Sequence, residues 1–322
     1  MNDYLSFFIL ILILNILLAF FILKNIDRFS RLFRLIDFEK NKIHVKDTPK
    51  YGFFVFSLLI ISTLSINLIY FNKIEFYILL IYLSSFLLIG FLDDLYELKV
   101  WKRLVLATTV VSLFYYFNYQ EYYVSSSFLN IINFLLLIFF TLGFIHLVNI
   151  TDGLNGLVSS LFLYSCIYYF LKGFDNYDIF YKFFIIINIF IFFIFIIPNF
   201  LGICFLGNTG AYLIAIIVSI LYLELYKISV LEYSDILLIY LIPLVDGLRV
   251  TLNRIKNKRN PFKGDFSHLH HLVRNNKIHT LIFFFIVFYP SIINFFYSDF
   301  TIIIGVISIL SFFLFLMYIK KN

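Results

Sequence analysis

Long apolar runs set the strongest limit on how this chain can fold. The sequence has 322 residues, of which 62% are hydrophobic and only 14% are charged. A soluble domain of this length cannot bury so much apolar surface, whereas runs of about 17 to 22 apolar residues can cross a bilayer as helices. Lipid offers no hydrogen-bond partner to an open backbone, and the alternating pattern of a barrel strand is absent from the sequence. We therefore expect an all-α, polytopic integral membrane protein with a single transmembrane domain over residues 1–322.

About eleven spans are expected, all of them helices. The first run has no basic segment before it and no small-residue cleavage site after it, so it is expected to be a span and not a removable signal peptide. The expected spans lie near residues 4–23, 52–71, 75–92, 103–118, 128–148, 156–172, 180–197, 211–226, 234–250, 279–297 and 299–319.

Lys and Arg are unevenly distributed over the loops between these spans. If residues 24–50 lie inside, all but four of the 25 basic residues lie on that same side. Cytoplasmic loops retain basic residues, so we expect the N-terminus outside and the C-terminus in the cytoplasm. Basic loops of this kind fix topology and contact anionic lipid headgroups. The formal net charge of +6 therefore calls for membrane lipid and not for a nucleic acid as partner.

Acids, amides and histidines collect in four segments, here called the polar islands. They cover residues 91–97, 149–156, 205–210 and 246–271, and each lies at the cytoplasmic end of an expected span. An ionisable group near hydrocarbon is costly, so such islands are candidates for a functional site.

The first island holds the adjacent carboxylates Asp93 and Asp94. Two like charges this close oppose joint ionisation unless a cation relieves them, and Lys99, Lys102 or a divalent metal ion could do so. Solvated residues at a helix end would give the same pair, but a pair that directly ends an apolar span is the stronger indication of a site.

The second and third islands are glycine-containing turns that precede the next span. Asn149, Asp152 and Asn155 lie in the second island. Asn208 lies in the third island, shortly after Asn199. A helix N-terminus with free N–H groups suits a phosphate, whereas a simple capped turn would need similar residues. Two such turns on one face suggest a shared anionic ligand.

The fourth island runs from Asp246 past Arg254 to His268, His270 and His271. Its histidines are expected to donate hydrogen bonds to phosphate. A structural role and metal ligation are the alternatives, although thiolate partners and a zinc-type spacing are missing from the sequence.

Together the islands offer acids for a hard divalent cation, cationic and N–H groups for phosphates, and access to membrane lipid. Sites rich in oxygen that leave positions for water suit Mg²⁺ bridging substrate phosphates. The reaction class that uses all three is phosphoryl transfer onto a lipid-borne acceptor.

These residues match a known pattern over most of the chain. The chain resembles the bacterial polyprenyl-phosphate N-acetylhexosamine-1-phosphate transferases, relatives of the phospho-N-acetylmuramoyl-pentapeptide translocase. The resemblance is carried by five ordered segments: residues 34–52 with Lys42 and His44, the Asp pair within 91–95, residues 149–157, residues 205–211, and Asp265 with residues 268–271. The last segment is closer to the aminosugar branch.

What the resemblance implies is the transfer of a sugar 1-phosphate, GlcNAc-1-phosphate in the first place, from a UDP-N-acetylhexosamine to undecaprenyl phosphate, with release of UMP. Mg²⁺ would assist, with Mn²⁺ as an alternative. The protein would start a lipid-linked surface polysaccharide in a bacterial inner membrane, with its active site in the cytoplasm. The sequence leaves the aminosugar, the polymer and the oligomeric state open, with a homodimer as one alternative.

The resemblance also implies roles for individual residues. Asp93, Asp94 and Asp152 would be catalytic, and Asp94, Asp152 and Asn208 would approach the metal. Substrate binding would fall to Lys42, His44, Asn149, Asn155, Asn199, Arg254, His268, His270 and His271.

Two positions depart from the family pattern. His146 stands where many relatives carry Asn, and Asn208 stands where the family usually has a metal-binding Asp. An amide oxygen can coordinate Mg²⁺ but brings no charge, so it should bind the ion less tightly. The competing hypothesis is therefore a catalytically weak or inactive paralogue that binds lipid-linked sugar or a partner enzyme. A transporter, which would carry charges near the bilayer midplane, ranks last.

Overall fold

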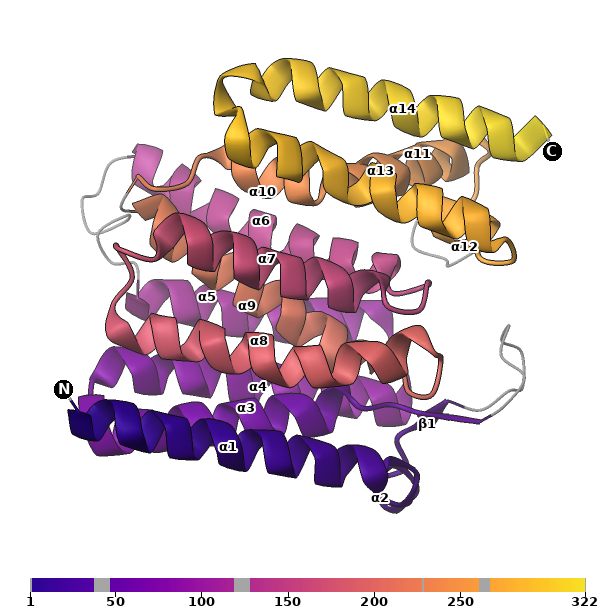
Figure 1. Ribbon diagram of the computed structural model, residues 1–322. Coiled ribbons are helices and arrows are strands. Elements are labelled where there is room, and N and C mark those ends of the chain that lie inside the picture. The colour runs from indigo at the N-terminus through magenta and orange to yellow at the C-terminus, as the bar shows by residue number, and fades with distance from the viewer. Residues whose placement is uncertain (1, 38–46, 119–127, 228, 261–266, 322) are drawn as a thin grey trace.

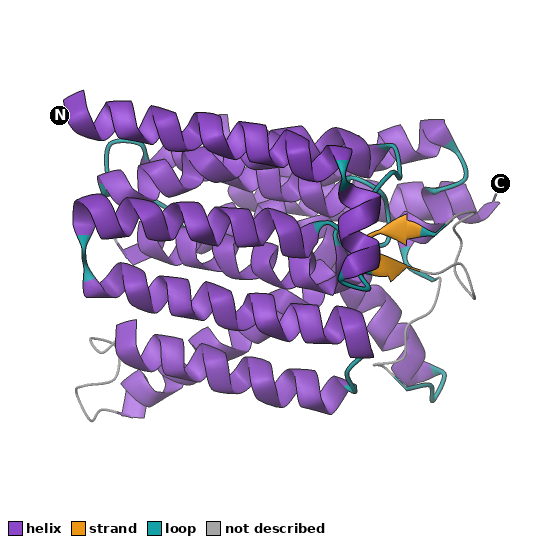
Figure 2. Ribbon diagram, turned by 90° about the horizontal axis from the view of Figure 1, so that it is seen from below, coloured by secondary structure: helices purple, strands orange, loops and turns teal. Residues whose placement is uncertain are grey.

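The computed structural model describes residues 2–37, 47–118, 128–227, 229–260 and 267–321. These parts of the chain are helical apart from connecting turns and one short hairpin, in which β1 (Ile36–Asp37) pairs antiparallel with β2 (Thr48–Pro49). Figure 1 shows the long helices running side by side, and Figure 2 shows the hairpin at one end of them. The helices are α1 (Asn2–Lys24), α2 (Ile26–Leu32), α3 (Gly52–Ile66) with its continuation η1 (Asn67–Phe71), α4 (Ile74–Tyr96), α5 (Val100–Asn118), α6 (Phe128–Thr151), α7 (Leu157–Gly173), α8 (Ile179–Phe200), α9 (Gly207–Lys227), α10 (Tyr233–Ile239), α11 (Leu241–Lys256), α12 (Leu269–Val273), α13 (Lys277–Phe296), η3 (Ser298–Phe300) and α14 (Thr301–Lys321).

The expected all-α, polytopic membrane architecture is confirmed. Within the described ranges, eight helical segments are long and apolar enough to cross a membrane. Three expected spans fall outside that set. The one at 103–118 lies in α5, whose first turn contains Lys102 and Arg103, and the one at 156–172 is α7, a shorter apolar helix of 17 residues. The third is interrupted.

The expectation of one continuous span over 234–250 is wrong. The chain forms α10 and α11 instead, with Tyr240 between them at φ −107° and ψ 12°. Pro243 explains the break, because it has no N–H for the carbonyl of Ile239 and its ring would clash with that carbonyl in a continuous helix. The break turns α11 into a separate element that carries Asp246 toward the polar end of the bundle.

Helix α9 forms the centre of the bundle. Sixteen of its residues are buried, from Thr209 to Leu225, because apolar side chains surround its whole circumference. It packs against α3, α4, α6 and α7, while α10, α11, α13 and α14 form a group of their own beside these helices (Figure 1). The N-terminus and C-terminus lie at opposite ends of the bundle (Figure 1), as expected for chain ends on opposite sides of a membrane.

Glycines allow α3 and α4 to approach the start of α9 closely. A Cβ added at Gly90 would lie 2.4 Å from the Cα of Thr209, and one added at Gly52 would lie 2.2 Å from the carbonyl oxygen of Leu206. Small residues are what permits such close backbone contact between membrane helices. The first turn of α9 is therefore held between two neighbouring helices.

We expect Gly90→Ala to destabilise the protein by about 1–3 kcal/mol, because the added methyl group has to displace the backbone of α9. Gly305→Ala is the matched control, since its Cβ would meet no side chain closer than 3.8 Å. Thermal unfolding of both variants in detergent measures the difference. An unchanged midpoint for Gly90→Ala would show that α4 and α9 can separate without cost.

Candidate active site

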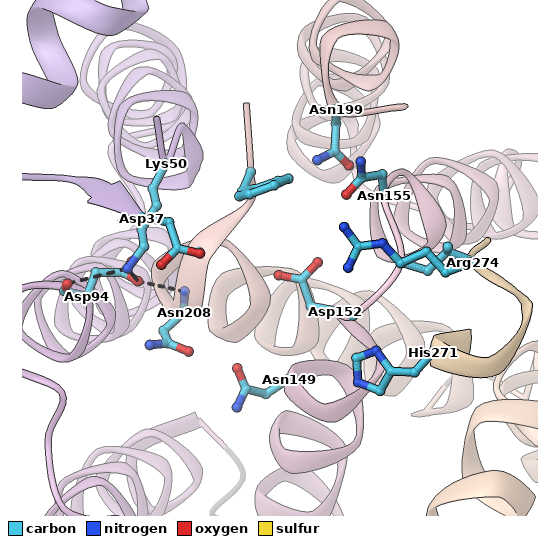
Figure 3. A pocket seen from close by; sticks show the side chains of 14 residues that line it. Asp37, Lys50, Asp94, Asn149, Asp152, Asn155, Asn199, Asn208, His271 and Arg274 are labelled. Carbon is cyan, nitrogen blue, oxygen red and sulfur yellow. Dashed lines mark hydrogen bonds and ion pairs between the residues drawn. The ribbon is translucent and has the colours of Figure 1, made fainter. Parts of the chain in front are cut away.

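The four polar islands meet in one pocket at the end of the bundle (Figure 3). Its volume is about 410 Å³, and it lies where the ends of α4, α6 and α8 meet the start of α9. The polar and charged residues in its wall are Asp37, Lys50, Asp94, Asn149, Asp152, Asn155, Asn199, Asn208, His271 and Arg274. The expectation that the islands share one face is therefore confirmed.

The carboxylate of Asp94 holds the N-terminus of α9. Its Oδ1 accepts hydrogen bonds from the backbone N–H of Asn208 at 2.9 Å and from Lys50 Nζ at 3.1 Å. Its Oδ2 accepts from the N–H of Thr209 at 3.0 Å and from the Thr209 hydroxyl at 2.6 Å. The first N–H groups of a helix have no partner within the helix, and a carboxylate there also meets the positive end of the helix dipole. Asp94 thus caps α9 from a neighbouring helix.

Gly207 makes this capping contact sterically possible. Its φ is +73°, in the left-handed region, and a Cβ at this position would lie 2.9 Å from Asp94 Oδ2. Only glycine adopts such a conformation without strain while leaving room for the carboxylate. The glycine of the third island therefore serves the contact with Asp94.

Asp93 points to a different neighbourhood, although it is adjacent in sequence. Its Oδ1 accepts from the N–H of Leu98 at 2.9 Å, and its Oδ2 accepts from Tyr212 Oη at 2.7 Å and Arg103 Nη1 at 3.2 Å. Successive residues of a helix face about 100° apart. Hence Asp93 lies outside the wall of the pocket, and the pair does not act as two carboxylates at one point.

The carboxylate of Asp152 differs from those of Asp93 and Asp94 in its lack of side-chain contacts to the described part of the chain. It follows the last residue of α6, is partly buried, and forms no side-chain hydrogen bond or ion pair within the described ranges. Burial and the nearby Asp94 carboxylate raise the pKa of Asp152 to about 8. Burial and the like charge of Asp94 thus both favour the protonated form of Asp152.

Two amide side chains lie around the same space as Asp152. Asn149 projects from the last turns of α6 and Asn208 from the first turn of α9, and both line the pocket (Figure 3). Neither amide forms a side-chain hydrogen bond to the described part of the chain. Three oxygen-bearing groups are thus available to one ligand.

Asn199, by contrast, has both ends of its amide engaged. Its Oδ1 accepts from the N–H of Gly156 at 3.0 Å and the hydroxyl of Ser159 at 2.9 Å, and its Nδ2 donates to the carbonyl of Cys204 at 2.9 Å. These contacts connect the end of α8 to the glycine turn and to the segment before α9. Asn199 is 4% exposed, so it is placed to hold the two turns together.

The histidine island is organised by Asp246. One oxygen accepts two hydrogen bonds from Arg249, at 2.7 and 3.1 Å, and the other accepts from the N–H of Leu269 at 3.1 Å and pairs with His268 Nδ1 at 3.0 Å. Ligand atoms of Asp246, His268 and His270 lie within 4.8 Å of one another, which would suit a metal ion. However, the Asp246 oxygens already accept four contacts, so the geometry favours a structural role for this carboxylate.

His270 and His271 pack against the second island. A Cβ at Gly153 would lie 2.3 Å from His270 Nε2 and 2.8 Å from Cε1 of His271. Burial lowers the pKa of His270 to about 3, so this imidazole is neutral at physiological pH. His271 lines the pocket, while His268, His270 and Arg254 are buried and lie outside its wall.

Sequence reasoning missed two basic residues of the pocket. Lys50 belongs to the segment at 34–52 that carries the family resemblance, so a closer reading of that segment could have found it. Arg274 follows His271 by three residues and had no motif to mark it. Lys42, His44 and Asp265, which the sequence analysis singled out, lie outside the described residues.

A second, apolar groove adjoins the pocket. Its volume is about 450 Å³, and it lies between α5 and α6, with α4 and α9 behind. Its apolar walls are formed by Phe86, Ile89, Val100, Leu104, Ala107, Phe139, Leu142, Gly143 and Ile145. At one end stand Arg103, His146, Tyr212 and Asn149, and Asn149 also lines the polar pocket. The two cavities therefore meet at one side chain.

Comparison with known proteins agrees with this geometry. Residues 76–226 match the model of the family described as Glycosyl transferase family 4. The matched segment runs from α4 to α9, so it includes Asp94, Asp152 and Asn208 but not the histidine island. A search among curated proteins gives no match. Over residues 76–226, slightly less than half of its length, this membrane protein is therefore similar to glycosyl transferase family 4.

Proposed function

We propose that the protein transfers a sugar 1-phosphate from a UDP-N-acetylhexosamine, with UDP-GlcNAc as first candidate, to undecaprenyl phosphate. The observation that carries the proposal is the meeting of a polar, oxygen-lined pocket with an apolar groove at Asn149. The polar and charged walls of the first cavity suit a nucleotide sugar, and the apolar walls of the second suit an isoprenoid chain. The reaction would start a lipid-linked surface polysaccharide at the cytoplasmic face of a bacterial inner membrane.

In the proposed reaction, an oxygen of the lipid phosphate attacks the phosphorus that carries the sugar. A new oxygen–phosphorus bond forms there, and the bond to the bridging oxygen of the diphosphate breaks, so that UMP leaves. The lipid phosphate is already an anion and needs little help to act as a nucleophile. Catalysis of phosphoryl transfer therefore depends mainly on positioning and on charge neutralisation.

Lys50 and Arg274 are proposed to neutralise the diphosphate of the donor. Both line the polar pocket, and Lys50 already contacts Asp94 from the edge of the hairpin. A lysine side chain has three N–H donors, so Lys50 can contact Asp94 and a phosphate oxygen together.

A divalent cation fits the donor set of the pocket. The Asp152 carboxylate forms no side-chain hydrogen bond or ion pair within the described ranges, and the amide side chains of Asn149 and Asn208 line the same pocket. Oxygen ligands in this number leave room for water and phosphate oxygens around Mg²⁺, with Mn²⁺ as an alternative. When bound, the ion would offset the charge that accumulates on the diphosphate.

The two acids of the first island are proposed to act by positioning. Asp94 places Asn208 through the capped start of α9, and Asp93 places Arg103 at the end of the groove. Their hydrogen-bonding capacity is largely used in these contacts. This favours the positioning role over a direct role as a base for the lipid phosphate.

We expect Asp152→Asn to lower turnover by about 100-fold or more, because it removes the charged ligand from the metal site. The measurement is the release of UMP and of lipid-linked sugar from labelled UDP-GlcNAc, undecaprenyl phosphate and Mg²⁺. Glu75→Gln is the matched control, since Glu75 is exposed at the opposite end of α4. If Asp152→Asn has the same unfolding temperature as the wild type and keeps most of its activity, the role of Asp152 is contradicted.

We expect Asn208→Asp to lower the Mg²⁺ concentration needed for half-maximal turnover, by roughly tenfold, since the new carboxylate adds a charge to the cation site. Titration of Mg²⁺ in the same assay measures the shift. A wild-type protein that is inactive with every UDP-sugar tested would favour the weak or inactive paralogue. If Asn208→Asp instead raises the Mg²⁺ requirement above that of wild type, this position is ruled out as a ligand.

A further inference from the structure

The groove between α5 and α6 has its polar groups at one end only. On α5, Val100, Arg103, Leu104 and Ala107 face it, and Arg103 is the charged member of that face. On α6 the facing residues follow helical spacing from Phe139 through His146 to Asn149. The polar residues therefore mark the end of the groove that adjoins the polar pocket.

Arg103 has hydrogen-bonding capacity left for a ligand. Its Nη1 contacts Asp93 Oδ2 at 3.2 Å and Tyr212 Oη at 3.3 Å. Its Nε and Nη2 have no hydrogen-bond partner within the described ranges. A guanidinium group fixed on one side presents its remaining donors in a defined direction, which suits a phosphate.

His146 stands opposite Arg103 across the groove. It is exposed on the groove wall, and neither ring nitrogen forms a hydrogen bond to the part of the chain that is described. Arg103, which lines the same end of the groove, gives His146 a cationic neighbour. A polar side chain in an otherwise apolar membrane groove is unfavourable unless it serves a ligand or reaches water.

A neighbouring groove provides the contrast. It has a volume of about 370 Å³ and lies between α4 and α5, lined mainly by apolar side chains such as Ile78, Val110 and Leu113. Among the described residues in its wall, none is a lysine, arginine or histidine. Apolar shape alone thus occurs twice along α5, whereas the combination with Arg103 and His146 occurs in the groove that opens to the polar pocket.

We propose that His146, together with Arg103, binds the phosphate of the lipid acceptor and so sets where the nucleophile lies relative to Asn149. This inference rests on the proposed function and assigns a role to a residue that departs from the pattern implied by the family resemblance. The occupant is a lipid phosphate with an isoprenoid tail, because the cationic end matches the phosphate and the apolar walls match the tail. The nucleotide sugar remains in the polar pocket.

Steady-state kinetics with His146→Ala and His146→Asn test the proposal. We expect the KM for undecaprenyl phosphate to rise about tenfold in the Ala variant, as for loss of a hydrogen bond to a charged group. The rise should be smaller in the Asn variant, which keeps a donor. The KM for the UDP-sugar should stay unchanged in both. Leu113→Ala, in the neighbouring groove, should leave both constants at the wild-type level.

An unchanged acceptor KM in His146→Ala, or an equal rise in the donor KM, would overturn the proposal. Direct binding keeps the test independent of turnover. Native mass spectrometry of the purified protein should show retention of undecaprenyl phosphate over undecaprenol in wild type and loss of that preference in His146→Ala. Equal retention of phosphatidylglycerol would show a general headgroup site and would also overturn it.

These measurements distinguish a failure of the proposed lipid-phosphate site from a failure of the proposed transfer reaction. A wild-type protein that prefers the lipid phosphate through His146 but turns over no UDP-sugar would contradict the proposed transfer and leave the binding assignment standing. Normal turnover, with no effect of His146 substitutions on the acceptor KM, would support the proposed transfer and contradict the assignment of His146.

Discussion

The contact between Asp94 and the first turn of α9 is the interaction on which the site depends. It joins the end of one helix to the start of the central helix, and Lys50 connects it to the hairpin. Because a carboxylate and a helix N-terminus attract each other through charge and through free N–H groups, the contact fixes both direction and distance. The polar islands need this contact, since turns alone would not hold their side chains at a common point.

The polar groups at this end of the bundle fall into two kinds. Asp93, Asp94, Asn199 and Asp246 have most of their hydrogen-bonding capacity used by the protein itself. Asp152, Asn149 and Asn208 have no such side-chain partner in the described structure. Groups of the first kind define a rigid frame, and those of the second kind are available to ligands. This division fits a reaction that relies on preorganised charge.

The sequence predicted much of this arrangement, because apolar length and basic loops constrain membrane helices strongly. It placed the four islands together, and it named Asp152 and Asn208 from their motifs. It could not separate the roles of Asp93 and Asp94, since the direction of each side chain depends on the rotation of α4. It also missed the break at Tyr240, where Pro243 interrupts a helix that the apolar run alone predicts as continuous. Arg274 could not be predicted either, because only the tertiary fold brings it into the pocket wall.

Helix α6 enters both cavities, and this has a geometric consequence. His146 and Asn149 are separated by three residues of one helix, which corresponds to a rise of about 4.5 Å and nearly one full turn. If each residue contacts its proposed substrate, the covalent geometry of a single helix sets the spacing between nucleophile and electrophile. No loop closure or domain movement is then required to keep that spacing. Thermal motion of α6 relative to its neighbours would move both substrates together, because both would contact the same helix.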